Sequence, residues 1–142
     1  MSFSLPDPST EFGARVAERL QTERVIWIVT TAADGTPQPN PVWFLWDGAE
    51  FLIYSLPNAA RVEHIRRNPH ISLHFNSSDD GGDVVVFSGV AREVPDAPTA
   101  DQVPEYVERY KDSIQNLFEN RDTFAKRYSL ALRITPTKVR GF

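Results

Sequence analysis

Hydrophobic positions along the chain recur at the spacings of helices and strands. Near the N-terminus, Phe12, Val16 and Leu20 recur every four residues, which predicts an amphipathic helix. Ser9 or Thr10 precedes this pattern and carries the side-chain oxygen that caps the start of a helix. The chain is therefore expected to begin with a helix that packs through one apolar face.

Six stretches predict strands, because they are rich in β-branched and aromatic residues or alternate between apolar and polar positions. They cover residues 25–31, 37–46, 51–54, 70–75, 83–94 and 130–135. The first stretch lacks alternation, which indicates a strand covered on both faces. Asp-Gly pairs at 34–35 and 47–48 are strong hairpin signals, so the first three strands are expected to form an antiparallel meander.

Proline and glycine limit how these strands pair. Three prolines between positions 37 and 41 exclude the first half of the second strand from a fully paired central position, whereas residues 42–46 can take one. Ser88-Gly89 predicts a bulge or a close backbone approach in the fifth strand. Pro136 is expected to close or kink the last strand.

A second helical region is predicted near the C-terminus. Residues 99–128 carry apolar side chains at helical spacing, with Pro104 expected in the first turn or at a break there. About six strands with turn-rich joints and three or four helices favour a mainly β fold. The expected architecture is a six-stranded antiparallel β-barrel with peripheral helices, formed by residues 1–142 as one domain.

Composition excludes several kinds of function. The 142 residues are 41% hydrophobic, which suits one globular domain with its own core. The absence of cysteine excludes disulfides, thiol catalysis and cysteine-ligated metals. A net charge of −4 argues against nucleic-acid binding. No apolar run approaches the roughly 20 residues that span a bilayer, and no secretory signal is recognisable, so a cytoplasmic protein without membrane contact is expected.

The stretch from 51 to 75 has the order strand, tight turn, short helix, strand. Asn58 is expected to cap the helix. Free backbone N–H groups at a helix start, beside Ser55 and Arg61, can bind a phosphate through hydrogen bonds and the helix dipole. The alternative is an ordinary cap followed by a solvated basic helix. The sequence thus predicts an anion site here without deciding between these two interpretations.

Other residues give weaker signals. His70 and His74 would lie about 13 Å apart on one strand, too far to share a metal, so no metal site is expected. The acidic residues around the glycines at 81–82 are interpreted as a solvated hairpin tip. No G-x-S-x-G elbow supports a catalytic triad. Trp43, beside Pro41, either belongs to the core or borders a flat ligand.

Six short motifs in series resemble the pyridoxamine 5′-phosphate oxidase-like superfamily of split β-barrel flavoproteins. They are IVTTAADG at 28–35, PNPVWF at 39–44, Tyr54-Ser55, NAARV at 58–62, RRNP at 66–69 and PTKVR at 136–140. More closely, the chain is similar to the actinobacterial branch that uses the deazaflavin coenzyme F420. The resemblance extends from about Glu11 to Phe142.

This resemblance implies a homodimer of six-stranded split barrels with two cofactor sites at the subunit interface. The phosphate would be bound at the strand-to-helix turn, and the ring system would lie along the second strand. The residues implied to bind the cofactor are Asn40, Pro41, Val42, Trp43, Tyr54, Ser55, Asn58, Ala60 and Arg61. Arg61 occupies a position where the family usually has lysine, and its guanidinium suits phosphate equally well.

The resemblance further implies hydride transfer from reduced F420 to a small organic acceptor, with the cofactor supplying the chemistry. FMN is the alternative cofactor. FMN-binding members carry an Arg-Lys pair at the helix start, but here Ala60 precedes Arg61. Arg66 and Arg67 either meet the acidic tail of F420 or form a solvated helix end. The hypotheses are an F420-dependent reductase, an FMN-dependent oxidase or reductase, and a binding protein without turnover; no catalytic residue is assigned.

Overall fold

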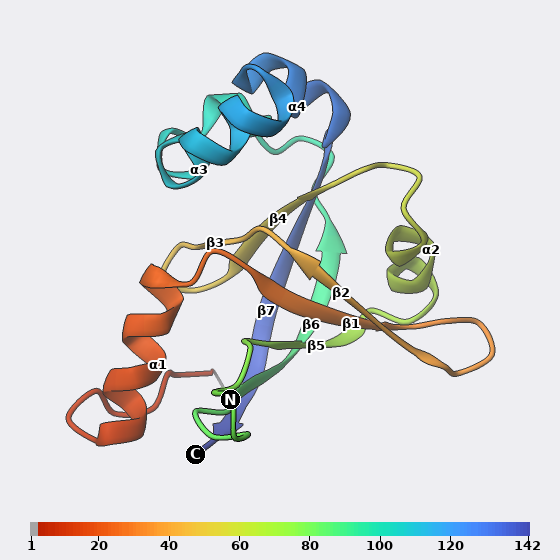
Figure 1. Ribbon diagram of the computed structural model, residues 1–142. Helices are drawn as coiled ribbons and strands as arrows, with labels where there is room; N and C mark the ends of the chain where they lie inside the picture. Colours follow the sequence, from red (N-terminus) through yellow and green to blue (C-terminus); the bar gives the residue numbers. More distant parts are fainter. Residues whose placement is uncertain (1–2) are drawn as a thin grey trace.

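The computed structural model describes residues 3–142, which form a curled antiparallel sheet with helices around it (Figure 1). In chain order the elements are α1 (Glu11–Thr22), β1 (Ile26–Thr31), β2 (Pro37–Val42), β3 (Leu45–Trp46), β4 (Phe51–Ser55), α2 (Ala60–Arg67), β5 (His70–His74), β6 (Val85–Glu93), the 3₁₀ turn η1 (Ala100–Gln102), α3 (Pro104–Phe118), α4 (Arg121–Arg127) and β7 (Leu130–Gly141). The strand order is β2-β1-β5-β6-β7-β4-β3, and every pair is antiparallel. The expected split β-barrel with peripheral helices is confirmed.

The described residues contain seven strands, where the sequence predicted six. The difference arises because the stretch 37–46 divides into β2 and β3, which lie at opposite edges of the sheet. At the break, the Tyr110 hydroxyl accepts a hydrogen bond from the Phe44 N–H at 2.9 Å and lies 3.0 Å from the Phe44 carbonyl oxygen. Because the Tyr110 hydroxyl accepts this hydrogen bond, the Phe44 N–H is satisfied without a partner strand.

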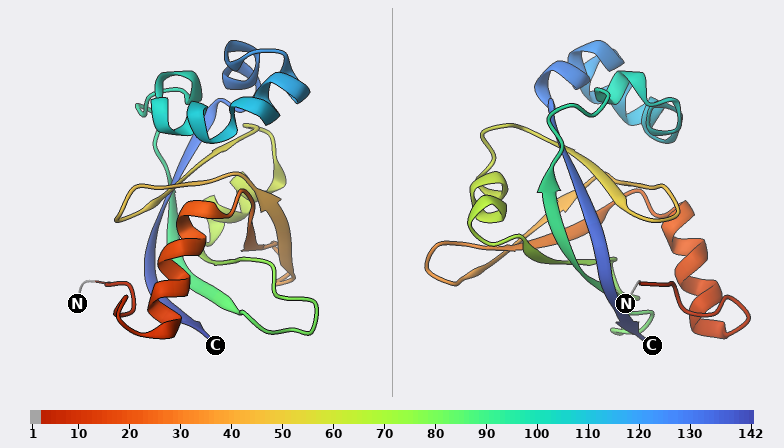
Figure 2. Two further views of the ribbon diagram at one scale, coloured as in Figure 1. Left: turned by 60° about the vertical axis from the view of Figure 1, so that its left-hand side comes forward. Right: turned by 180° about the vertical axis from the view of Figure 1, so that it is seen from behind.

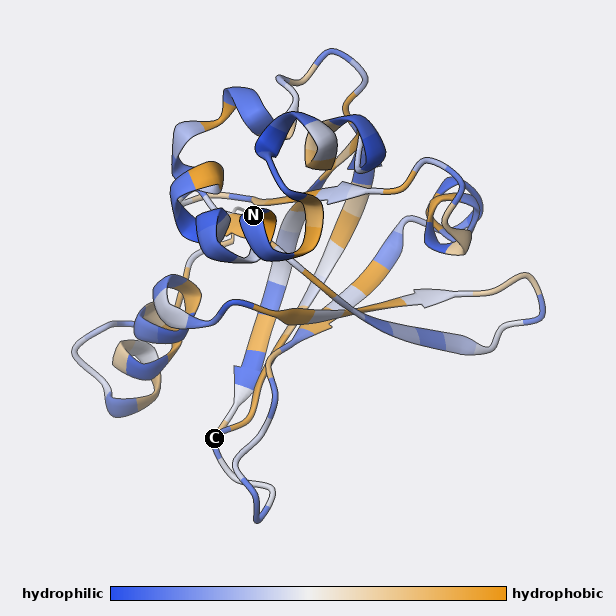
Figure 3. Ribbon diagram, turned by 45° about the horizontal axis from the view of Figure 1, so that its top comes forward, coloured by the Kyte–Doolittle hydropathy of each residue, from blue (hydrophilic) through white to orange (hydrophobic). Residues whose placement is uncertain are grey.

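The prolines of β2 agree with its place at the edge of the sheet, as expected. Both expected hairpins are present, since β2 pairs with β1 and β3 pairs with β4. They do not form one continuous meander, because β2 and β3 lie at opposite edges of the sheet. The prediction that the first strand is covered on both faces is wrong for the single chain. Buried and half-buried positions alternate along β1, because one face packs in the core and the other looks outward. Figure 3 shows hydrophobic and hydrophilic bands alternating along the strands.

Strands β6 and β7 form the longest pair of the sheet, and their register shifts between Ser88 and Gly89. A Cβ atom on Gly89 would lie 2.9 Å from both Ile134 Cγ2 and Thr135 O, which confirms the predicted close approach. Pro136 is expected from the sequence to close or kink the last strand. It does not close the strand, whereas the register shift beside it agrees with a kink. Strand β7 continues to Gly141, because the bulge places Pro136 opposite Gly89, which has no side chain in the way.

The helices lie at three places around the sheet. Helix α2 follows β4 and contacts β1 and β6. Helix α1 begins after Thr10, whose Oγ1 accepts a hydrogen bond from the Gly13 N–H, and it buries Val16 and Leu20 against the core of the sheet. Helices α3 and α4 lie together over the opposite end of the sheet, as Figure 2 shows. Pro104 occupies the first turn of α3, as predicted. The α3–α4 layer encloses a second apolar cluster, which is separate from the core inside the sheet.

None of the helices in the described part of the chain is both long and apolar enough to cross a membrane.

Candidate functional site

The predicted anion site lies at the turn between β4 and α2. The Ala59 N–H donates to the Leu56 carbonyl at 3.2 Å, and the helix begins at Ala60. The prediction that Asn58 caps this helix is wrong. Ala59 occupies the N-cap, no side chain caps it, and Asn58 is exposed one residue earlier. The start of the helix is therefore left without a side-chain acceptor of its own, which leaves room for an external one.

Arg61 is the cation of this turn. Its Nη1 donates to Ser55 Oγ at 2.9 Å, and Ser55 Oγ donates to the Leu56 carbonyl at 3.0 Å. Ser55 is fully buried, so its hydroxyl holds the Arg61 guanidinium from the interior of the protein. The Nε atom of Arg61 is buried and has no hydrogen-bond partner among residues 3–142. A buried donor without an acceptor is costly, so Arg61 is suited to receive an acceptor from outside the chain.

The electrostatic surroundings of Arg61 also favour an anionic ligand. Burial lowers the pKa of its guanidinium, and the influence of Tyr128 opposes that shift in smaller part. No carboxylate of the described chain contributes to the balance. Since the ordinary pKa of arginine is far above neutral pH, the group stays cationic at neutral pH. Arg61 is therefore a half-buried, uncompensated positive charge.

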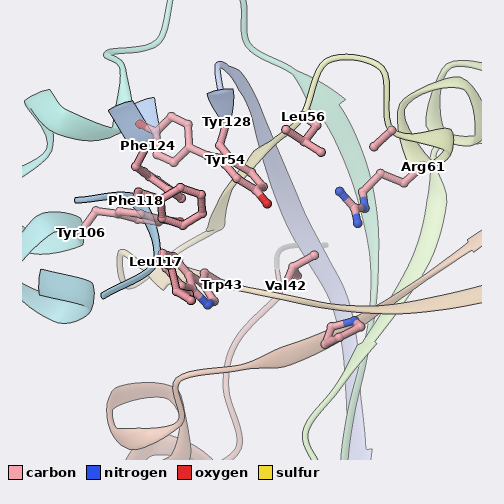
Figure 4. Close-up of a pocket in the computed structure, with 12 residues that line it drawn as sticks. Val42, Trp43, Tyr54, Leu56, Arg61, Tyr106, Leu117, Phe118, Phe124 and Tyr128 are labelled. Carbon is pink, nitrogen blue, oxygen red and sulfur yellow. The ribbon is translucent and has the colours of Figure 1, made fainter. Parts of the chain in front are cut away.

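A cavity of about 290 Å³ lies between this turn and the α3–α4 layer. We call it the Arg61 cavity, and its lining residues are Pro41, Val42, Trp43, Tyr54, Leu56, Ala59, Arg61, Tyr106, Leu117, Phe118, Phe124 and Tyr128. Figure 4 shows the Arg61 guanidinium on one side of the cavity and the aromatic residues of the helical layer on the other. The cavity thus joins a cationic end to an aromatic end.

The aromatic end is built by packing within the helical layer. Trp43 stacks on Tyr110 with ring centroids 4.5 Å apart and also packs against Phe124 at 5.2 Å. Tyr106 is fully buried at this end, and its hydroxyl has no hydrogen-bond partner in the described chain. Burial raises the pKa of Tyr106 well above its ordinary value, so the phenol remains protonated. The aromatic lining of this end of the cavity suits a flat, largely apolar group.

The structure brings together most residues that the sequence singled out. Pro41, Val42, Trp43, Tyr54 and Arg61 line the cavity. Ser55 is next to it through its hydrogen bond to Arg61, whereas the remaining three predicted residues are not among the lining residues. These three are Asn40, Asn58 and Ala60. Trp43 is both a packing residue and a lining residue, so the two interpretations of it are compatible.

Sequence reasoning missed the helical wall of the cavity. It consists of Tyr106, Leu117, Phe118, Phe124 and Tyr128. The available signal was the density of aromatic residues between positions 106 and 128, which the helical spacing alone assigns to a core. Those residues do form a core, but its surface also borders the cavity.

The other candidates lie outside this site. Arg66 forms ion pairs of 2.8 Å with Glu63 and Glu93, so it is already compensated, while Arg67 is exposed. His64 Nδ1 lies 2.8 Å from the Thr30 hydroxyl, which indicates a structural contact. Among residues 3–142, no group of three or more His, Cys, Asp or Glu side chains is placed to hold a metal.

Comparison with known proteins identifies the class to which this split barrel belongs. The sequence model of the pyridoxamine 5′-phosphate oxidase family matches residues 12–142, nearly the whole chain. The chain therefore belongs to the pyridoxamine 5′-phosphate oxidase family. No curated protein matches it significantly.

Solved structures share the fold but differ in what they are described as binding or doing. An F420 reductase superimposes with a TM-score of 0.68 and 25% identity, covering 87% of this chain and 94% of that one. HutZ, the heme storage protein from Vibrio cholerae, gives 0.65 and 14%, with 93% and 95% covered. An FAD-binding protein from Mesorhizobium loti gives 0.59 and 22%, with 89% and 88% covered. These neighbours therefore show the fold that the chain shares with them, while their descriptions name different ligands or activities.

Proposed function

We propose that this protein is an F420-dependent reductase that transfers a hydride to a small organic acceptor. The observation that carries the proposal is the half-buried guanidinium of Arg61, which has no carboxylate partner among the described residues, at one end of a cavity whose other end is aromatic. F420 combines a phosphate with a flat deazaflavin ring, so its two parts match the two ends. The similarity to an F420 reductase supports the same assignment.

Arg61 and the start of α2 would hold the phosphate of the coenzyme. Ser55 keeps the guanidinium in place through its 2.9 Å hydrogen bond, and the unused N–H groups of the first helical turn add donors. Charge-assisted hydrogen bonds of this kind contribute about 1.5–3 kcal/mol each. Two or three such bonds are enough to anchor the coenzyme by its anionic part.

The remaining residues would orient the ring and exclude water. Residues 41–43 offer backbone groups along the edge of the sheet, while Tyr106 and Phe118 cover the ring from the helical layer. When bound, the reduced deazaflavin supplies a hydride, and the acceptor takes its balancing proton from solvent or a nearby donor. The protein contributes position and an apolar environment, which agrees with the lack of an evident acid–base pair.

FMN is the second candidate cofactor, because the family is named for an oxidase and its fold is also found in a flavin-binding protein. The position before Arg61 argues for F420. Ala60 is exposed and carries no charge, so the pair of cations that grips FMN phosphate in other members is reduced to one. A yellow colour with flavin absorbance in the purified protein would favour FMN, and a colourless protein that binds added F420 would favour the deazaflavin.

We further propose that the protein is a homodimer with the cofactor sites at the subunit interface. The outer face of the sheet supports this arrangement. Trp27 and Val29 of β1 are half-buried there and lie in register with His74 and Ser72 of β5, and Val86 follows on β6. A second copy would cover these apolar side chains. Light scattering should give twice the chain mass of 16.1 kDa, and a monomer at micromolar concentration would contradict the dimer.

The test of the function is a fluorescence titration with F420 and with FMN, carried out in parallel on the wild type, Arg61→Ala and Arg67→Ala. Loss of Arg61 should weaken F420 binding about ten- to hundredfold, because one charge-assisted contact disappears. Arg67 lies on the same helix but is exposed, so its variant should change affinity by no more than about twofold. Circular dichroism checks that both variants keep the fold.

Three results decide between the candidates. Unchanged F420 affinity in Arg61→Ala would remove the role given to that residue. Tighter binding of FMN than of F420 would transfer the proposal to a flavin-dependent enzyme. If reduced F420 binds but is oxidised by none of a panel of conjugated alkenes and quinones, the protein binds the coenzyme without turning it over.

A further inference from the structure

The chain has four tyrosines, and their hydroxyl groups differ in what they contact. The hydroxyls of Tyr54 and Tyr110 each donate to a backbone carbonyl at 2.7 Å. Tyr106 is fully buried among other aromatic rings, so its hydroxyl is out of reach of a ligand. Tyr128 is half-buried and lines the Arg61 cavity. It is therefore the tyrosine to consider for ligand binding.

The hydroxyl of Tyr128 is an unused and accessible donor. Within residues 3–142, the backbone N–H of Tyr128 donates to the Phe124 carbonyl at 2.9 Å, whereas its hydroxyl has no hydrogen-bond partner. The buried side-chain atoms without a partner in that part of the chain belong to Arg15, Arg61 and Tyr106, so the Tyr128 hydroxyl is not one of them. A ligand in the cavity can therefore reach it.

The ring of Tyr128 is fixed by its neighbours in the helical layer. It stacks on Phe124 with ring centroids 5.0 Å apart and meets the edge of Phe118 at 5.5 Å, and both of these residues line the cavity. Tyr128 itself lies in the short connection between the end of α4 and the start of β7. The packing thus leaves the hydroxyl little freedom, which favours a defined partner over a mobile contact with solvent.

Tyr128 and Arg61 lie on different walls of the same cavity. Figure 4 shows Tyr128 on the side of the helical layer and Arg61 on the side of the β4–α2 turn. Burial lowers the pKa of the Arg61 guanidinium, and Tyr128 is the group whose influence opposes that shift. The phenol and the guanidinium are accordingly within electrostatic reach of one another. An anion held by Arg61 would come close to Tyr128.

We propose that the Tyr128 hydroxyl donates a hydrogen bond to the phosphate whose charge is held by Arg61. A guanidinium has donors alone, so Arg61 cannot accept the phenolic proton, whereas a phosphate offers acceptors to both groups. The phosphate would then connect the β4–α2 turn to the helical layer. Tyr128 is a specificity-determining residue in this arrangement, because it favours a phosphate over a neutral hydroxyl at the same place.

This inference rests on the proposed function for the identity of the ligand. It adds a contact to the phosphate from the α4–β7 connection, which neither the sequence motifs nor the similarity to other structures assigns.

Tyr128→Phe tests the proposal, because it removes one oxygen atom and keeps the aromatic packing with Phe118 and Phe124. In a fluorescence titration, the variant should bind F420 about tenfold more weakly than the wild type. Its affinity for the same deazaflavin without the phosphate should stay within about twofold. The melting temperature of the free protein should change by no more than about 2 °C, since the lost hydroxyl has no partner there.

Tyr110→Phe is the matched control, with the same atom removed from a hydroxyl that is already bonded. Tyr110 does not line the cavity, so this variant should lower the melting temperature and keep F420 affinity within about twofold of the wild type. Wild-type affinity for F420 in Tyr128→Phe would overturn the proposal. So would equal losses of affinity for the deazaflavins with and without phosphate, because the hydroxyl would then contact another part of the ligand.

The proposed function and this inference fail in different ways. Wild-type protein that binds FMN but not F420 rejects the F420 assignment, and Tyr128→Phe is then titrated with FMN and with riboflavin, which lacks the phosphate. A tenfold loss for FMN alone supports the role of Tyr128, and unchanged FMN affinity rejects it. Wild-type protein that binds none of these compounds rejects both proposals.

Discussion

Arg61 differs from Arg66, although both are arginines of the same short helix. Arg66 is exposed and forms ion pairs with Glu63 and Glu93. Arg61 is half-buried, donates to the buried hydroxyl of Ser55 and keeps Nε unpaired. A residue that is desolvated without a counter-charge is destabilising unless it binds something, which is the reason that Arg61 and not Arg66 marks the site.

Sequence reasoning could identify Arg61 but not Tyr128, and the reason lies in what each residue type signals. A cation at the start of a helix, after a strand and a tight turn, has a recognised use in phosphate binding. A tyrosine at helical spacing predicts burial and says nothing about the partner of its hydroxyl. The error at Asn58 is of a similar kind, since Asn is a good cap by type but the turn places Ala59 in the capping position.

At the residue scale we also predict how acid affects Glu50. Arg92 donates two hydrogen bonds to the Glu50 carboxylate, at 2.8 and 3.0 Å, and this pairing lowers the pKa of Glu50 below its ordinary value. Glu50→Gln should therefore destabilise the protein at pH 7. The difference from wild type should begin to shrink as the pH falls below about 4.3, because the carboxylate of the unfolded chain takes up a proton there first. It should disappear once the pH is below the lowered pKa of the folded carboxylate.

The measurement is urea unfolding of both proteins at a series of pH values between 7 and the acid limit of folding. Glu18→Gln serves as the control, because Glu18 is exposed on α1. Parallel curves for wild type and Glu50→Gln over the whole acid range would show that the Arg92 contact contributes no pH-dependent stability.

Among the elements, the α3–α4 layer has two roles that the sequence presents as one. Its inward face packs Tyr106, Tyr110 and Ile114 against the sheet, whereas the end of α3 borders the Arg61 cavity. Helical spacing predicts the first role and cannot separate the second. A residue that lines the cavity and is also highly exposed should therefore contribute more to the site than to the stability of the fold.

Leu117 is such a residue, with 67% of its surface exposed although it lines the cavity. Leu117→Ala should change the free energy of unfolding by no more than about 0.5 kcal/mol. It should nevertheless weaken coenzyme binding about fivefold, because an apolar contact of about 1 kcal/mol is lost.

Ile114→Ala gives the opposite pattern and is the matched comparison. Ile114 is buried, so its truncation should cost about 2–5 kcal/mol of stability. Chemical unfolding and F420 titration of both variants provide the two quantities. A strongly destabilised Leu117→Ala variant with normal affinity would show that the end of α3 serves the fold and not the site.

At the scale of the molecule, turn signals determined most of the architecture. The two Asp-Gly hairpins, the edge position of the proline-rich strand and the antiparallel pairing all follow from local chemistry. What could not be predicted depends on contacts between distant residues. The split of the stretch 37–46 requires the hydroxyl of Tyr110, and the passage of β7 through Pro136 requires the bulge beside Gly89. Neither partner is visible in the local sequence.

The outward face of β1 illustrates the same limit. Its apolar residues suggested a strand covered on both sides, but in one chain Trp27 and Val29 are half-buried. If two chains associate through this face, the pattern in the sequence describes the assembly better than it describes the single chain.

The central claim is that Arg61 binds the anionic part of a flat coenzyme in the cavity that it shares with the α3–α4 layer. The most direct measurement is a crystal structure of the protein with F420. We predict a phosphate oxygen about 2.7–3.2 Å from the Arg61 guanidinium and the deazaflavin ring extending toward Tyr106. An Arg61 cavity that stays empty or filled by side chains at saturating coenzyme would contradict the account.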